Sequence, residues 1–263
     1  MLSILSPFLA AKVAEPLFFK PLRFGIPERE KDFRSKALQG AHQTVDGKIN
    51  WFHLPGVGPR ILFVHGWSGR GSQFAPLMEA ASAKGADIYT FDAPGHGEEQ
   101  LGRTDMLAFV RSIEWMNETF GPFHWAVGHS LGGMALWNAL DRGLPLHTLV
   151  NIGSPASIEG VILDFVHAIG AREVVVDRML NLLQKKYQIE PSSLSPVSIA
   201  TKHPHLKGGM LHATDDGDVP LQHAEQLSAV WKNGQLYRYE GLGHRRILRD
   251  PEVIHQCLSL LGV

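Results

Sequence analysis

The sequence has very little cysteine and almost no net charge. Cys257 is the single cysteine among 263 residues, so an intrachain disulfide bond is excluded and a reducing compartment, the cytoplasm, is expected. The formal net charge is −1, with no basic excess that would favour nucleic acid as a partner and no polybasic run that would favour anionic lipid. Internal repeats and low-complexity tracts are also missing, so we expect one domain of moderate size that can carry an insertion.

A long uninterrupted hydrophobic run is missing as well. Residues 1–19 are mostly apolar, but Pro7, Lys12, Glu15 and Pro16 interrupt them, and the stretch is too short to span a bilayer. It also lacks the positive start of a secretory signal. We therefore favour a helix packed on the domain or preceding it. A membrane-surface anchor is a less favoured alternative, and a cleaved signal is the third.

Short apolar runs alternate with amphipathic stretches along most of the chain. Residues 21–46 are interpreted as a surface extension and a first edge strand, with Asp46-Gly47 as a hairpin turn. The alternation predicts a mostly parallel central sheet with helices on both faces, an α/β fold. The predicted strands are 48–53, 60–65, 86–91, 123–127, 147–152, 209–213 and 235–239. The predicted helices are 73–83, 104–120, 131–140, 221–232 and 251–261.

The alternation is interrupted between residues 156 and 204. Two amphipathic stretches, 158–169 and 172–187, are followed by a Pro/Ser-rich connection at 190–198. This pattern predicts a helical lid inserted over the C-terminal edge of the sheet. Its apolar residues (Ile162, Phe165, Val166, Ile169, Met179 and Leu183) favour an apolar acyl or alcohol group in the substrate if they face the pocket, and the alternative is that they only bind the lid to the core. The predicted division is an N-terminal extension (1–44), a core (45–155 and 205–263) and a lid or cap (156–204).

The strongest local motif is the sequence GHSLGG at residues 128–133. It follows a short apolar run and precedes a helical pattern, and strand, Gly-x-Ser-x-Gly, helix is the arrangement of a nucleophile elbow. The turn is so tight that side chains at Gly128 and Gly132 would clash with the backbone. Ser130 is therefore expected at the tip of the turn, with the amide of Leu131 directed to the same place.

A nucleophilic serine needs a base, and the base needs a carboxylate that orients it. In a parallel sheet, useful side chains lie just beyond the C-terminal ends of the strands. The strand at 209–213 is followed by Asp215, Asp216 and Asp218, and the strand at 235–239 is followed by His244.

Over residues 45–262 the chain resembles the α/β-hydrolase fold superfamily. Four segments carry the resemblance: His65-Gly66-Trp67, the DAPGHG turn at 92–97, the GHSLGG elbow, and the closing acid and base segments. The resemblance implies that Ser130 is the nucleophile and His244 the base. The D-x-x-V-P pattern of the family assigns the acid to Asp216, with Asp215 and then Asp218 as alternatives.

The resemblance also implies a reaction. Two backbone amides, those of Trp67 and Leu131, would stabilise the oxyanion, with Ser68 as the alternative to Trp67. The expected activity is that of a serine hydrolase of the carboxylesterase type, which cleaves small-molecule esters of short- to medium-chain acyl groups through an acyl-enzyme. No cofactor is expected, and the sequence makes no prediction of the oligomeric state.

Several alternatives stay open. A lipase or lysophospholipase, a thioesterase, an amidase or a carbon–carbon bond hydrolase would use the same triad. A dehalogenase or epoxide hydrolase is disfavoured because those enzymes carry an aspartate where Ser130 stands. A non-catalytic ligand-binding member of the fold is the alternative from another class.

The remaining histidines near these motifs have structural interpretations. His65 and His96 are expected to support their loops through hydrogen bonds, and His129 is interpreted as a packing residue. His203 and His205 form an H-x-H pair without a third ligand nearby in sequence, so no metal site is expected.

Overall fold

The computed structural model describes residues 6–98 and 102–263. Within these ranges the chain forms an eight-stranded sheet in the order β1-β2-β4-β3-β5-β6-β7-β8. β2 is antiparallel to its neighbours β1 and β4, and every other neighbouring pair is parallel, so the predicted mostly parallel sheet is confirmed. The strands are β1 (Leu38–Thr44), β2 (Gly47–Leu54), β3 (Arg60–Val64), β4 (Asp87–Asp92), β5 (Trp125–His129), β6 (Thr148–Ile152), β7 (Lys207–Ala213) and β8 (Gly234–Tyr239).

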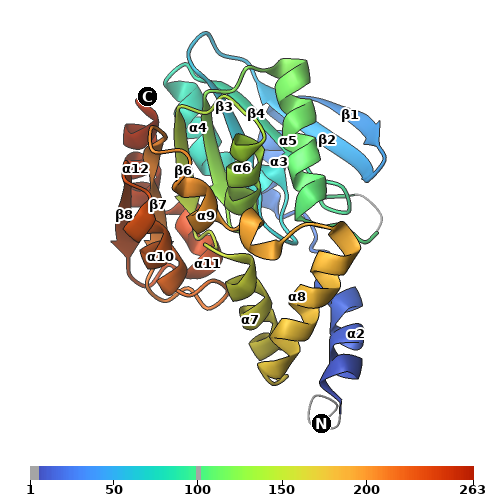
Figure 1. The fold of residues 1–263 in the computed structure, drawn as a ribbon. Coiled ribbons are helices and arrows are strands. Elements are labelled where there is room, and N and C mark those ends of the chain that lie inside the picture. Colours follow the sequence, from blue (N-terminus) through green and yellow to red (C-terminus); the bar gives the residue numbers. More distant parts are fainter. Residues whose placement is uncertain (1–5, 99–101) are drawn as a thin grey trace.

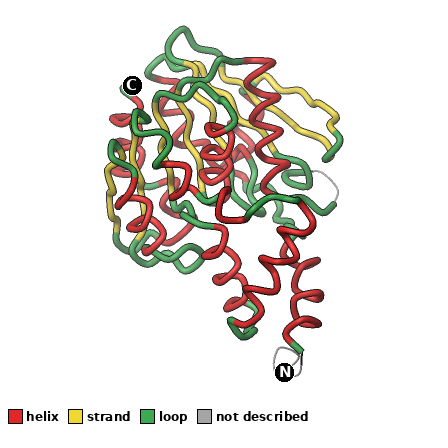
Figure 2. Tube along the Cα trace, in the orientation of Figure 1, coloured by secondary structure: helices red, strands yellow, loops and turns green. Residues whose placement is uncertain are grey.

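Helices connect the strands and cover both faces of the sheet (Figures 1 and 2). The α-helices are α2 (Pro7–Phe18), α3 (Glu28–Lys36), α4 (Ala75–Ala83), α5 (Met106–Phe120), α6 (Leu131–Asp141), α7 (Ile158–Ala168), α8 (Val174–Tyr187), α9 (Pro196–Ala200), α10 (Gln222–Val230), α11 (Gly243–Arg246) and α12 (Pro251–Leu261). Short 3-10 helices are η1 (Gly71–Phe74), η2 (Pro191–Leu194) and η3 (Ile247–Arg249).

The two faces of the sheet bury separate hydrophobic clusters because side chains alternate along each strand. On β3, Leu62 and Val64 pack in a cluster with residues of α5, α6, α9 and α10. Ile61 and Phe63 point the other way and pack with residues of α3, α4 and α12. Every strand residue of β4, β5 and β6 except Trp125 is buried, which explains their continuous apolar runs.

Two local predictions need correction. The hairpin between β1 and β2 is present, but Thr44 pairs with Gly47, so Val45 and Asp46 form the turn. The stretch before β1, interpreted as a surface extension, contains helix α3. That helix has acidic residues in its first turn and basic residues in its last turn, which favours helix formation, and it buries Phe33 against the sheet.

A third correction concerns the connection at 190–198, which folds as η2 followed by α9. Proline occupies the first position of both helices, where its missing amide costs no hydrogen bond. Ile199 and Ala200 of α9 are buried in the core cluster next to α6. This part of the 156–204 segment therefore packs on the core.

Helices α2, α7 and α8 form a separate lobe at one end of the sheet (Figure 1). They share a third hydrophobic cluster, to which Ala11 and Ala14 of α2 contribute along with Val166 and Met179. The predicted packed helix near the N-terminus is thus confirmed for residues 7–18, whereas residues 1–5 lie outside the described part. Among the described residues, no helix is both long and apolar enough to cross a bilayer.

Candidate active site

The loop between β5 and α6 holds Ser130 in a strained conformation. Ser130 has φ 52° and ψ −126°, in a region that residues with a side chain rarely occupy. A Cβ atom at Gly128 would lie 2.4 Å from Gly133 Cα, and one at Gly132 would lie 2.1 Å from the Val64 carbonyl oxygen. The expected need for glycine at both positions is confirmed, and the predicted elbow geometry is present.

Two backbone amides predicted as oxyanion donors lie beside this serine. Leu131 begins α6, so its amide has no partner within the helix, and in the described ranges the amide of Trp67 also has no hydrogen-bond partner. The loop that carries Trp67 approaches the elbow closely, since a Cβ at Gly66 would lie 2.6 Å from Ser130 Cβ. Ser68, the alternative donor, has φ 58°, and its hydroxyl accepts a hydrogen bond from the Leu22 amide at 2.8 Å.

The structure brings His244 and Asp216 together. His244 Nδ1 lies 2.8 Å from Asp216 Oδ2, and Asp216 Oδ1 accepts hydrogen bonds from the amides of Asp218 at 2.9 Å and Val219 at 2.8 Å. Burial by itself would raise the pKa of Asp216. The hydrogen bonds from His244 and the two amides outweigh burial and hold that pKa below its usual value. Asp216 is therefore an ionised acceptor that directs the His244 ring.

The two alternative acids make other contacts. Asp215 Oδ1 accepts a hydrogen bond from the Gly243 amide at 3.0 Å, so this side chain supports the loop that carries His244. Asp218 Oδ2 lies 3.9 Å from a guanidinium nitrogen of Arg245. In the part of the chain that the structure describes, neither carboxylate contacts the His244 ring.

Ser130 and His244 line one cavity of about 990 Å³. Within the described residues, no hydrogen bond joins the Ser130 hydroxyl to the His244 ring. Such hydrogen bonds commonly shorten only when substrate is bound. The geometry therefore joins Asp216 to His244 and places Ser130 and His244 on the same cavity.

His65 supports the loop that follows β3, as predicted. Its Nδ1 donates to the Gly66 carbonyl at 2.8 Å, and its Nε2 accepts from the Ala93 amide at 3.0 Å. Complete burial holds the pKa of His65 well below its usual value, so the ring stays neutral in this tautomer. His96 also supports its own loop, through a 3.1 Å contact between Nδ1 and the Pro94 carbonyl.

His129 does more than pack. Its Nε2 donates to the backbone carbonyl of His244 at 2.8 Å, and its Nδ1 accepts from the Gln73 side-chain amide at 3.1 Å. Gln73 Oε1 in turn accepts from the Arg70 amide at 3.4 Å. The interpretation as a packing residue was incomplete, because the partners lie in η1 and α11, which are distant in sequence, and no local pattern signals them.

The cavity is lined largely by apolar side chains from three parts of the chain, which are the N-terminal segment, the α/β core and the inserted segment. Phe165 and Leu183 of the inserted segment face it, whereas Ile162, Val166 and Met179 are buried in the cluster shared by α2, α7 and α8. Ile169 is exposed instead. The N-terminal segment also contributes, a role that sequence reasoning missed: its apolar lining residues are Leu17, Phe18, Phe19, Leu22 and Phe24.

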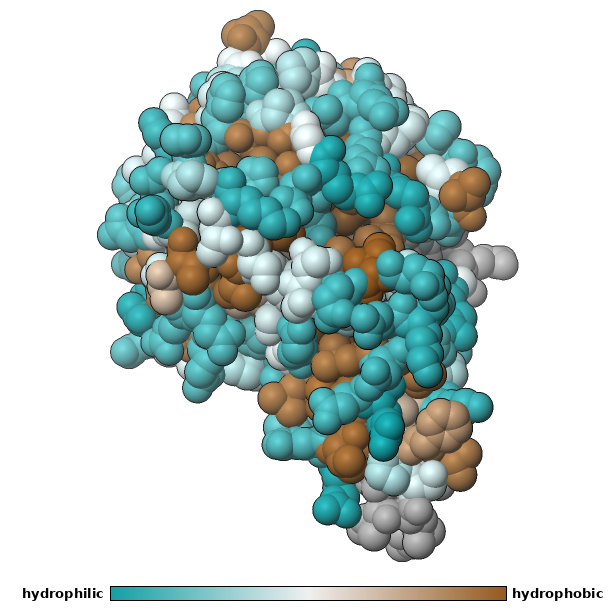
Figure 3. Space-filling model, viewed as in Figure 1, coloured by the Kyte–Doolittle hydropathy of each residue, from teal (hydrophilic) through white to brown (hydrophobic). Residues whose placement is uncertain are grey.

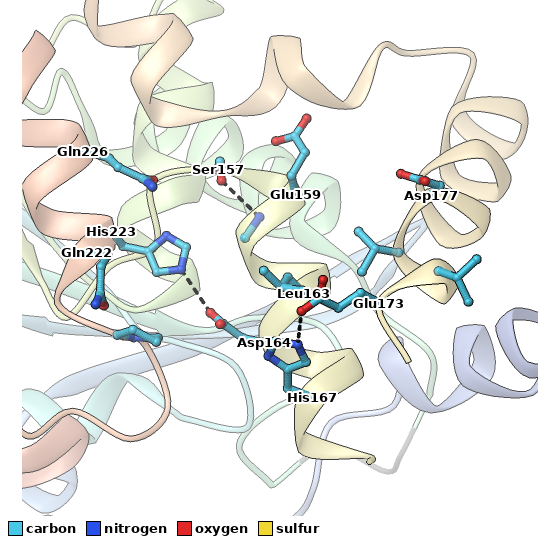
Figure 4. Close-up of a pocket in the computed structure, with 14 residues that line it drawn as sticks. Ser157, Glu159, Leu163, Asp164, His167, Glu173, Asp177, Gln222, His223 and Gln226 are labelled. Carbon is cyan, nitrogen blue, oxygen red and sulfur yellow. Dashed lines mark hydrogen bonds and ion pairs between the residues drawn. The ribbon is translucent and has the colours of Figure 1, made fainter. Parts of the chain in front are cut away.

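A second cavity, of about 860 Å³, lies on the other side of α7 (Figure 4). His223 of α10 donates from Nε2 to Asp164 of α7 at 3.0 Å, and its Nδ1 accepts from the Ala156 amide at 3.1 Å. Asp164 lines both cavities, so α7 is the wall between them, and the His223 contact holds that wall against the core. Across residues 6–98 and 102–263, no group of three His, Cys, Asp or Glu side chains is placed to hold a metal ion.

Comparisons with known proteins identify relatives of part of this chain and structures with a similar fold. The family described as alpha/beta hydrolase fold matches residues 59–186. The chain is 33% identical over 84 residues to a pimeloyl-[acyl-carrier protein] methyl ester esterase of Xylella fastidiosa (strain 9a5c), covering 32% of each chain. It is 30% identical over 118 residues to the protein of the same name from Stenotrophomonas maltophilia (strain R551-3), covering 44% of this chain and 43% of that one.

These matches span less than half the length of the curated relatives. Among solved structures, alpha/beta hydrolase domain-containing protein 10 from mouse superposes with a TM-score of 0.63 at 18% identity, covering 86% of this chain and 97% of that one. This likeness concerns the fold. The family match over residues 59–186 and the structural likeness show that the chain has the α/β-hydrolase fold.

Proposed function

We propose that this chain is a serine hydrolase that cleaves carboxylic esters of short- to medium-chain acyl groups through an acyl-enzyme. Ser130 is the nucleophile, His244 the general base and Asp216 the acid that orients the base. The observation that carries the proposal is the 2.8 Å contact of Asp216 with His244, which lines the same cavity as Ser130 in its strained turn.

The first half of the reaction forms the acyl-enzyme. Asp216 accepts a hydrogen bond from the Nδ1–H group of His244, and this tautomer leaves the Nε2 lone pair free to take the proton of Ser130. Ser130 Oγ then bonds to the ester carbonyl carbon, and negative charge develops on the carbonyl oxygen. The amides of Leu131 and Trp67 donate to that oxygen, a type of contact worth about 100- to 1000-fold in rate.

The second half releases both products. The tetrahedral intermediate collapses, the bond to the alcohol oxygen breaks, and His244 gives its proton to the leaving alcohol. Water then attacks the acyl-enzyme while His244 accepts its proton, and the acid leaves with the Ser130 hydroxyl restored. Helices α7 and α8 of the inserted segment act as the lid of this site and, together with the N-terminal segment, provide the apolar wall of the cavity.

The first experiment tests whether the serine reacts at all. A fluorophosphonate probe should label Ser130 in the wild-type protein and leave Ser130→Ala unlabelled. An intact protein that remains unlabelled under the same conditions would favour the non-catalytic ligand-binding alternative.

The second experiment defines the bond that is cleaved. A panel of p-nitrophenyl esters of increasing acyl length, tested beside thioesters, amides and lysophospholipids, should show the highest kcat/KM for short- to medium-chain esters. Turnover of long-chain esters alone would contradict the proposed chain length, and a preference for thioesters, lysophospholipids or carbon–carbon substrates would select one of the alternatives with the same triad.

The names of the relatives favour one specific addition to this panel. Both of the relatives described above are called methyl ester esterases, so methyl esters of medium-chain acids belong in the panel. A small alcohol leaves most of the apolar cavity to the acyl group, which fits the side chains contributed by Phe165 and Leu183.

A further inference from the structure

The outer face of helix α2 has an unusual composition for a surface that faces water. The opposite face, which includes Ala10, Ala11 and Ala14, is buried against the lobe. A helix on a protein surface normally shows charged and polar residues toward solvent. Here only one exposed residue of α2, Lys12, is charged. We call the exposed residues of this helix the α2 outer face, and they are Phe8, Leu9, Lys12, Val13, Pro16 and Leu17.

The apolar members of this face are well exposed. Phe8 and Leu9 are each 51% exposed, and Val13 and Leu17 are each 55% exposed. Leu9, Val13 and Leu17 follow one another at intervals of four residues, so they form one continuous ridge. Figure 3 shows hydrophobic residues gathered over the same lobe. A contiguous exposed apolar surface of this kind marks an interaction site.

The ridge continues to the mouth of the catalytic cavity. Leu17 belongs to the α2 outer face and also lines the cavity. Leu22 and Phe24, farther along the same segment, are exposed as well and line the same cavity. A partner that covers the α2 outer face therefore lies next to the entrance through which an apolar substrate reaches Ser130.

The charges on α2 favour an anionic partner. Lys12 extends over the ring of Phe8, 4.7 Å from its centroid, and in the described ranges it has no carboxylate partner. Glu15, the one acidic residue of α2, is paired with Arg103 at 2.6 Å and Lys186 at 3.3 Å. The unpaired charge on this helix is therefore positive and lies among apolar side chains.

A lipid surface suits this combination better than a second copy of the chain. In a bilayer interface, apolar side chains enter the acyl boundary while a lysine reaches the anionic headgroups. A twofold contact between two α2 outer faces would instead bury unpaired Lys12 side chains in an apolar interface, which is costly. We propose that the α2 outer face docks the protein on an anionic phospholipid surface and places the cavity mouth beside the lipid.

Vesicle binding tests this proposal without reference to catalysis. Wild-type protein should cosediment with vesicles of phosphatidylcholine and phosphatidylglycerol, and Leu9→Asp combined with Val13→Asp should lower the partition constant by at least about tenfold. Lys12→Glu should weaken binding about fivefold, with little effect on vesicles of phosphatidylcholine alone. The matched control is Val45→Asp combined with Val57→Asp. Both valines are almost fully exposed on loops outside α2, so this double variant should bind vesicles as the wild type does.

A labelling experiment avoids variants that could disturb folding. The native Cys257 is completely buried, so a cysteine introduced at Val13 can be modified selectively. An environment-sensitive fluorophore on Val13→Cys should shift to shorter wavelength when vesicles are added, whereas the same dye on Val45→Cys should not.

Three outcomes would overturn the proposal. The first is that the wild type does not bind vesicles, and the second is that the variant with both Leu9→Asp and Val13→Asp binds them as well as the wild type does. The third is that the wild type forms a concentration-dependent dimer, which these two substitutions dissociate, and shows no vesicle binding. These readouts do not depend on Ser130. Failure of the vesicle proposal, an active esterase that does not bind vesicles, is therefore distinguishable from failure of the proposed function, a vesicle-binding protein without esterase activity.

Discussion

The side chain of His129 donates a hydrogen bond from Nε2 to the backbone carbonyl of His244, over 2.8 Å. The donor precedes Ser130 in the elbow, and the acceptor belongs to the residue proposed as the base. The Gln73 amide donates to the other ring nitrogen of His129, which fixes the ring as the neutral tautomer with its proton on Nε2. One buried imidazole thus connects the elbow, η1 and the short helix α11 that carries His244.

This connection predicts that His129 positions His244. His129→Phe removes both hydrogen bonds and should lower kcat about 10- to 100-fold with little change in KM, since small displacements of catalytic groups are costly. His129→Gln keeps a donor near the same place and should recover most of the loss. Steady-state kinetics on one ester checks both variants. Equal losses in the two variants, or an effect on KM alone, would show that the residue only packs.

The choice among the three aspartates makes a second prediction. Asp216→Asn should lower kcat about 10³- to 10⁴-fold, because His244 loses the acceptor that fixes its tautomer. Asp215→Asn weakens only the support of the Gly243 amide and should cost about tenfold or less. The ratio of kcat values measured on the same ester checks the assignment, and the reverse order would move the acid to Asp215.

Acid sensitivity is the third prediction. Burial, and then the proximity of His244, lowers the pKa of His129 from 6.5 to about 3. Between these values the unfolded chain binds a proton that the folded chain does not, so His129 stabilises the fold above pH 6.5 and this stability is lost as the pH falls toward 3. Urea unfolding of His129→Gln should show a slope against pH that is shallower by about 1.4 kcal/mol per pH unit in this window. Identical slopes would contradict a neutral buried imidazole.

The fourth prediction concerns the backbone at the elbow. Gly132→Ala would place a methyl group 2.1 Å from the Val64 carbonyl oxygen, so β3 or α6 must move. We expect a loss of more than about 3 kcal/mol in the free energy of unfolding, together with loss of fluorophosphonate labelling at Ser130. Gly102→Ala, at a position with no atom within 4 Å of the added Cβ, should be neutral in thermal unfolding. A stable, fully labelled Gly132→Ala protein would show that the turn tolerates expansion.

Much of the fold could be predicted because its signals are local. Burial on both faces of the sheet gives β3 and β4 continuous apolar runs, and burial on one face gives α5 apolar residues at helical spacing. Both patterns are visible within a few residues of sequence. Helix α3 was missed because Phe33 is its one buried hydrophobic residue and gives no periodic pattern. The pairing of its buried Glu30 with Arg70, 40 residues away, leaves no local trace either.

The amino-acid sequence by itself determined the sheet class, the strained position of Ser130 and its glycine neighbours, because each depends on residues that are adjacent along the chain. Only the tertiary structure decided which aspartate meets His244, that His129 holds the His244 backbone, and that the N-terminal segment lines the cavity. The hydrogen bond from the His129 side chain to the His244 backbone, for example, joins residues 115 positions apart in sequence. Their distances depend on how the whole chain packs, and no short pattern encodes them.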